Sequence, residues 1–266
     1  MERKITTEAL RRMKAEGQRI VALTAYDWTM ARLLDEAGVD VLLVGDSVAT
    51  VVQGEDTTVP VTVDEMVYHA RLVARGAKRA FVVGDLPFLS YQTGAKDALR
   101  NAGRMMKEAR VEAVKLEGGR AVIDVVKRLV DAGIPVMGHL GLTPQSIHAF
   151  GTYRVRATDS AEADELAADA HALANAGAFA LVLEKVPATL AKTVTAQSPI
   201  PTIGIGAGPH CDGQILVTHD MLGLFERFRP RFVRRYRELG VEMRNAAGEF
   251  AADVRAGRFP SLDESY

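Results

Sequence analysis

Eight short runs of apolar residues recur along the chain, and most of them are followed by a stretch with helical periodicity. The runs are continuous in Val, Ile and Leu and do not alternate with polar residues, which is typical of parallel strands covered on both faces. Eight strands that alternate with helices predict a single (β/α)₈ barrel, an α/β fold; an open doubly wound sheet is the alternative. The runs span residues 20–24, 39–44, 80–83, 111–116, 134–138, 179–183, 200–205 and 215–217.

The segments between the runs carry helix signals. Thr62 and Glu65 have the spacing of a capping box, ahead of an apolar stripe that Gly76 ends. Residues 159–177 repeat this pattern. Residues 206–213, in contrast, contain no helical stretch, so we expect the seventh and eighth strands to be joined by a loop.

Both ends of the chain are expected to add helices to the barrel. Residues 6–16 predict an opening helix that plugs one end of the barrel, and past Gly223 we expect a helical, arginine-rich C-terminal extension. No repeat or Ser/Gly-rich linker marks a boundary. We therefore expect residues 1–266 to form one catalytic barrel domain.

Composition narrows the class of protein. The 33 Lys and Arg against 34 Asp and Glu give a net charge of −1, which argues against a nucleic-acid binder. The single cysteine, Cys211, excludes an intrachain disulfide and fits a reducing compartment. No run reaches the ~18 apolar residues of a membrane span, and Met1–Glu8 shows no secretory signal. We expect a cytoplasmic enzyme that acts on small molecules, with neither nucleic acid nor membrane as a partner.

Charged residues follow the ends of the predicted strands. Catalytic groups of a (β/α)₈ barrel project from the carboxyl ends of several strands, so these side chains are expected on one rim. Each has an ordinary structural role open to it, such as a helix N-cap for an aspartate or a hydrogen-bonded core position for the histidine. Grouped carboxylates must nevertheless be paired or bind a cation, because burying an unpaired charge is costly. The rim set is Asp46, Asp85, Lys115, Glu117, His139 and Glu184.

The types of residue on this rim indicate its chemistry. An all-oxygen donor set without a Cys or His pair favours Mg²⁺ over Zn²⁺, and Asp46 and Asp85 would follow adjacent strands. Such a cation would hold an α-keto acid and stabilise its enolate. Glu184 is then the candidate base, with Lys115 and His139 orienting the substrate.

A glycine-rich stretch, Gly204–Gly208, invites interpretation as a phosphate loop, because loops after the seventh strand of a barrel often bind phosphate. No Lys or Arg follows it to pair a phosphate. We therefore favour a tight loop that leaves room for a ligand above the barrel.

Several motifs together resemble the ketopantoate hydroxymethyltransferase family, in unbroken order from about Thr6 to about Pro260. The stretches around His139–Gln145 and Gly204–Gln214 are the most specific. The other motifs are Gly45-Asp46-Ser47, Gly84-Asp85-Leu86-Pro87-Phe88, Val114-Lys115-Leu116-Glu117-Gly118-Gly119, Leu183-Glu184-Lys185-Val186-Pro187 and Asp220-Met221-Leu222-Gly223.

The resemblance implies a barrel of the phosphoenolpyruvate-utilising type and transfer of a hydroxymethyl group from 5,10-methylenetetrahydrofolate to 3-methyl-2-oxobutanoate, on the route to pantothenate and coenzyme A. It implies a Mg²⁺ site of Asp46, Asp85 and Glu117, in which Glu117 either binds the metal or lies behind the other two ligands, and it implies Glu184 as the base. Assembly as a homo-oligomer, a decamer, is implied as well. The substrate would contact Asp46, Ser47, Asp85, Lys115 and His139.

The chain departs from the family pattern at Thr152, Arg156 and Lys185, which concerns the lid and the folate contacts. Lys185 beside Glu184 would favour the ionised form of the base. Two other functions are kept open. One is a Mg²⁺-dependent lyase or mutase of a related keto acid or phosphoenol, although the Cys-containing loop typical of such lyases is missing. The other is a catalytically silent barrel that serves in an assembly.

Overall fold

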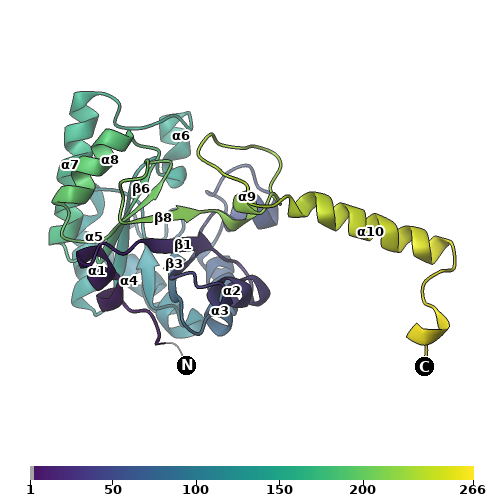
Figure 1. Cartoon of the computed structure of the whole chain (residues 1–266). Helices are drawn as coiled ribbons and strands as arrows, with labels where there is room; N and C mark the ends of the chain where they lie inside the picture. The colour runs from purple at the N-terminus through teal and green to yellow at the C-terminus, as the bar shows by residue number, and fades with distance from the viewer. Residues whose placement is uncertain (1–2) are drawn as a thin grey trace. The chain divides into compact units, whose positions relative to one another are not determined.

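Eight parallel strands close into a barrel in the order β1 to β8, with β8 pairing back to β1 (Figure 1). The structure is a computed structural model that describes residues 3–266. The closed barrel confirms the predicted fold and excludes the open doubly wound sheet. The strands are β1 (Ile20–Thr24), β2 (Val41–Val44), β3 (Phe81–Asp85), β4 (Ala113–Lys115), β5 (Val136–Gly141), β6 (Ala180–Glu184), β7 (Thr202–Ile205) and β8 (Gly213–Leu216).

Three strands run further than their apolar residues predict. β3 ends on Asp85, β5 passes through His139, and β6 ends on Glu184. Each of these charged residues therefore continues the hydrogen-bonded ladder instead of starting a loop. The carboxyl end of the barrel is polar because the strands themselves carry the polar side chains there.

Helices follow most of the strands, and the predicted signals for two of them are confirmed. The side chain of Thr62 caps α3 in a reciprocal capping box with Glu65, and Asp159 caps α7. Residues 206–212, between β7 and β8, form no helix, as predicted. The helical segments up to this point are α1 (Thr7–Ala15), α2 (Trp28–Glu36), η1 (Ala49–Gln53), α3 (Val63–Gly76), α4 (Ala95–Arg104), η2 (Met105–Ala109), η3 (Arg120–Val122), α5 (Ile123–Asp131), η4 (Pro144–Ser146), α6 (Ile147–Phe150), α7 (Ser160–Asn175) and α8 (Ala188–Gln197).

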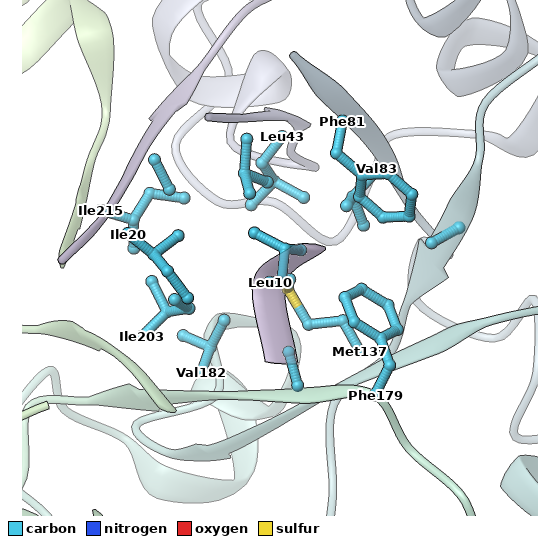
Figure 2. Packing of buried hydrophobic residues seen from close by; sticks show 14 residues of the cluster. Leu10, Ile20, Leu43, Phe81, Val83, Met137, Phe179, Val182, Ile203 and Ile215 are labelled. Carbon is cyan, nitrogen blue, oxygen red and sulfur yellow. The ribbon is translucent and has the colours of Figure 1, made fainter. Parts of the chain in front are cut away.

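The barrel interior is filled by apolar side chains from the strands and by one residue of α1. Figure 2 shows Leu10 surrounded by side chains that include Leu43, Phe81, Met137 and Ile203. Leu10 is 1% exposed, so it belongs to the centre of the core. The opening helix therefore plugs the barrel as predicted. Because alternate strand residues point to opposite faces, the residue two positions beyond each core residue also points inward.

The contacts within the chain define two compact units, residues up to 216 and residues 217–266, so the single-domain interpretation stays a prediction. The second unit holds α9 (Thr218–Met221), α10 (Leu239–Arg255) and η5 (Leu262–Glu264). The predicted helix through the arginine-rich stretch is wrong up to Glu238, because residues 222–238 form turns and irregular chain. Pro230 explains this, since it lacks an N–H and disfavours helix at the residue before it. Within residues 3–266, no helix combines the length and apolarity needed to cross a bilayer.

Candidate active site

The charged residues predicted for one rim do meet inside the mouth of the barrel. Asp85, Lys115 and His139 lie two residues beyond the core residues Val83, Ala113 and Met137, and so point inward with them. Glu184 follows Val182 in the same way, and Glu117 follows Lys115. The two-residue period of the strands is thus what collects these side chains.

Lys115 and Asp85 form a buried ion pair across β3 and β4. They are register partners in the two strands, and the ammonium Nζ donates to Asp85 Oδ1 at 2.5 Å. Burial by itself disfavours the charged lysine, but the nearby carboxylates of Asp85, Glu117 and Asp46 outweigh it and raise the pKa of Lys115. Lys115 is therefore a fixed positive charge inside the barrel.

Asp46 lies beside this pair, two residues after the end of β2. Its backbone N–H donates to Asp85 Oδ2 at 3.2 Å, and its own carboxylate accepts from the side chain of Gln145 at 2.9 Å. Burial first, and then the charges of Asp85 and Glu117, raise the pKa of Asp46 well above its usual value. Burial also raises the pKa of Asp85, although Lys115 partly offsets that rise. Two carboxylates in this environment favour a bound cation.

His139 stands between two carboxylates. Its Nδ1 atom lies 3.2 Å from Glu117 Oε1, and its Nε2 atom lies 3.4 Å from Glu184 Oε2. Burial and the Lys115 charge disfavour the imidazolium, but Glu117 and Glu184 outweigh them and raise the pKa of His139 to about 9. Burial likewise opposes ionisation of Glu117, yet His139, Lys115 and the N–H of Gln145 lower its pKa. Glu184 is the most accessible of these carboxylates, with 16% of its side chain exposed.

Ser47 also lies at the barrel mouth, where its hydroxyl is 2.8 Å from the hydroxyl of Tyr26. Three buried residues beside the site were missed from the sequence: Tyr26 contacts Ser47, whereas Tyr91 and Gln145 contact the rim set. Tyr91 accepts from the N–H of Glu117 at 3.1 Å, and Gln145 donates to Asp46. Gln145 lies in one of the motifs of the family resemblance, but neither strand periodicity nor charge identifies it as a site residue.

The two aspartates suit a magnesium ion. The rim set carries four carboxylates against one ammonium and one imidazole, so its net charge is negative when all of these groups are ionised. Magnesium commonly takes one or two protein carboxylates and completes its shell with water and substrate oxygens. Within the described part of the chain, no group of three or more His, Cys, Asp and Glu side chains could hold a metal by itself. Asp46 and Asp85 therefore fit a magnesium ion that keeps most of its other ligands.

The loop after β7 packs closely on α8. Gly208 has a φ of +78°, and a Cβ atom placed there would lie 2.4 Å from the Cβ atom of Ala188. Its carbonyl accepts from the side chain of Gln214 at 3.0 Å. Gly208 permits this close backbone approach, which fits the tight-loop interpretation. That the loop leaves room for a ligand above the barrel stays a prediction.

The residues that depart from the family pattern connect residues 151–157 to the end of β6. The ammonium of Lys185 donates to the carbonyl of Tyr153, and the carbonyl of Lys185 accepts from the N–H of Arg156 at 2.8 Å. The Arg156 guanidinium lies 4.1 Å from the ring centre of Phe150. Lys185 thus anchors a loop next to Glu184, and its predicted effect on the ionisation of Glu184 stays a prediction.

Charged groups buried at the carboxyl ends of barrel strands define a (β/α)₈-barrel enzyme. The model of the family described as ketopantoate hydroxymethyltransferase matches residues 4–262, and the chain belongs to that family. The chain is 59% identical to 3-methyl-2-oxobutanoate hydroxymethyltransferase of Prosthecochloris aestuarii, over 98% of this chain and 96% of that protein. It is 60% identical to the enzyme of the same name from Salinibacter ruber, over 99% of both chains.

Solved structures with the same barrel have low sequence identity and show the fold alone. A phosphonopyruvate hydrolase bound to oxalate and Mg²⁺ matches with a TM-score of 0.63 at 14% identity, over 98% of this chain and 93% of that one. A 2,3-dimethylmalate lyase of the phosphoenolpyruvate mutase/isocitrate lyase superfamily matches with a TM-score of 0.60 at 18% identity, over 97% and 90%. These likenesses confirm the predicted (β/α)₈ barrel, and its phosphoenolpyruvate-utilising type stays a prediction.

Proposed function

We propose that this protein transfers a hydroxymethyl group from 5,10-methylenetetrahydrofolate to 3-methyl-2-oxobutanoate and forms 2-dehydropantoate, a step toward pantothenate and coenzyme A. Membership of the family supports the reaction. The observation that carries the residue roles is the position of Glu184. It is the most accessible carboxylate of the rim set and stands 3.4 Å from His139, a cationic group.

Glu184 is the proposed base. It takes the proton from C3 of the keto acid, and the resulting electron pair moves toward the substrate's C2 oxygen. Lys115 and His139 provide fixed positive charges for that oxygen and for the substrate carboxylate, as electrostatic preorganisation requires. Water hydrolyses the methylene group of the folate to formaldehyde, which breaks its two C–N bonds and releases tetrahydrofolate. C3 then attacks the formaldehyde carbon, and the formaldehyde oxygen takes the proton from Glu184 and becomes the hydroxyl group.

Asp46 and Asp85 are the proposed magnesium ligands. When bound, Mg²⁺ would polarise the keto and carboxylate oxygens of the substrate as a Lewis acid. Glu117 faces His139 and accepts from the backbone of Gln145, so we assign it to holding His139 and place it behind the ligands. Ser47 would contact the substrate beside Asp46.

Deuterium exchange at C3 of 3-methyl-2-oxobutanoate, followed by NMR in D₂O with Mg²⁺, tests this proposal. Wild type should exchange the proton without folate, and Glu184→Gln and EDTA treatment should each abolish exchange. Glu36→Gln, an exposed glutamate at the end of α2, is the matched control and should exchange like wild type. No exchange by wild type, even with tetrahydrofolate present, would contradict the proposed reaction.

Two further properties are proposed. A homo-oligomer, a decamer by resemblance, is tested by sedimentation of the purified protein; a monomer at micromolar concentration would contradict it. A cytoplasmic location is supported by the single buried cysteine, Cys211, which fits a reducing compartment. Fractionation of cells that express the protein tests that location.

A further inference from the structure

Gln145 is a buried, uncharged residue in the middle of a charged site. It lies in η4, beyond the end of β5, and is 3% exposed. Burial of an amide is costly unless its donors and acceptor are all satisfied. The partners of this side chain therefore indicate what it holds in place.

Every polar atom of the Gln145 side chain has a partner. Its Nε2 atom donates to Asp46 Oδ2 at 2.9 Å and to the carbonyl of Leu86 at 3.0 Å. Its Oε1 atom accepts from the hydroxyl of Tyr91 at 2.8 Å. A flipped amide would set Oε1 against two acceptors, so the surroundings determine one orientation.

The amide fixes the direction of the Asp46 carboxylate without cancelling its charge. A Lys or Arg at this place would neutralise the carboxylate, as Lys115 partly does for Asp85. Gln145 occupies Oδ2 alone, and the other oxygen of Asp46 accepts no hydrogen bond within residues 3–266. The remaining oxygen is thus left open toward a cation.

The backbone of Gln145 reaches the opposite half of the site. Its N–H donates to Glu117 Oε2 at 3.0 Å, and the other oxygen of Glu117 faces His139. Tyr91 contacts both residues, because its hydroxyl bonds to Gln145 and accepts from the N–H of Glu117. One residue thereby connects the proposed metal ligand to the carboxylate that holds His139.

We propose that Gln145 is a positioning residue, whose side-chain amide orients Asp46 toward a divalent cation while its backbone N–H holds Glu117 against His139. This inference rests on the proposed magnesium site. Residues that orient a metal ligand typically change metal affinity 10- to 100-fold when they are replaced.

The test measures Mn²⁺ binding to metal-free protein by the EPR signal of free Mn²⁺, which needs no turnover. Gln145→Met keeps the length of the side chain and removes the amide, and we expect the Kd for Mn²⁺ to rise about 10-fold or more. Gln92→Met is the matched control. Gln92 is exposed, contacts the same Oε1 atom at 3.4 Å and does not reach Asp46, so its Kd should equal that of wild type.

A second variant covers the case in which Gln145→Met does not fold. Gln145→Asn keeps an amide but is one methylene too short to reach Asp46, and it should weaken Mn²⁺ binding in the same way. A folded Gln145 variant that binds Mn²⁺ as wild type does would overturn the positioning role and leave the proposed function intact. Wild-type protein that binds no Mn²⁺ would instead overturn the magnesium site itself, and this inference with it.

Discussion

His139 Nε2 lies 3.4 Å from Glu184 Oε2, and the same imidazole faces Glu117 on its other side. The base proposed for C3 is therefore next to a group that is cationic at neutral pH, because the pKa of His139 is raised to about 9 against burial and against Lys115. A substrate oxygen that gains negative charge near this imidazolium would be stabilised by its positive charge.

Replacement of His139 by Asn should lower kcat about 10²-fold, because one preorganised group that stabilises developing charge is typically worth that much. His171→Asn is the control, since His171 is exposed on α7. Steady-state rates and the C3 exchange rate measure the effect. Exchange at the wild-type rate in His139→Asn would remove His139 from the proposed mechanism.

Gly141→Ala should damage both stability and catalysis. Gly141 has a φ of +94°, and a Cβ atom there would lie 2.2 Å from the carbonyl oxygen of Glu184, so the backbone of Glu184, the proposed base, must move. Gly133→Ala is the matched control, because Gly133 has a φ of +81° and nothing within 4 Å of an added Cβ. We expect the free energy of unfolding of the control to fall by about 1 kcal/mol, the cost of a left-handed backbone at a residue with a Cβ atom, and its kcat to stay unchanged. Chemical denaturation and kcat distinguish the two; equal losses in both variants would contradict the close approach.

Leu10→Ala should lower the free energy of unfolding by about 3 kcal/mol, because it leaves a cavity at the centre of the barrel core. Leu33→Ala, at a leucine of α2 that is 48% exposed, should change the free energy of unfolding far less. Urea denaturation of the two variants measures the difference. A Leu10 variant as stable as the Leu33 variant would show that α1 does not fill the barrel in solution.

Asp35 should make stability depend on pH. Its carboxylate accepts from the backbone N–H groups of Lys78, Arg79 and Ala80, and these bonds outweigh the effect of burial and lower its pKa below 3.8. A carboxyl with a lowered folded pKa stabilises the fold above its unfolded pKa, and this contribution is lost as pH falls through the folded value.

We therefore expect Asp35→Asn to lower the free energy of unfolding by about 2 kcal/mol at pH 7, by weakening hydrogen bonds to a charged group. The difference from wild type should shrink as the pH falls below about 4. Asp131→Asn, at an exposed aspartate that ends α5, is the control. A difference from wild type that stays constant between pH 7 and pH 3.5 would contradict the assignment.

Much of the site follows from one property of the sequence, the two-residue period of a strand. Lys115 and Glu117 share a face because they are two residues apart, and Asp85 and Glu184 extend the inward rows of their strands. The same period could not place Asp46, which follows a turn at Gly45. Its position had to be inferred from the strand end alone.

The remaining site residues lie outside what periodicity can predict. Tyr91 lies in a loop and Gln145 in the short helix η4, both in connections that follow a strand, where the path of the backbone decides which buried groups meet. The arginine-rich stretch shows the opposite error, because its composition suits a helix while Pro230 prevents one. Composition predicts an element only where no single residue forbids it.

Leu10 has a consequence for the order of events at the site. Its side chain and the strand residues around it fill the amino end of the barrel, so molecules reach the rim set from the carboxyl end. Two reactants that enter from the same end must bind in order. The reactant that binds deeper binds first, and its product is released last. A leucine on the first helix thus determines the order of binding and release at the opposite end of the barrel.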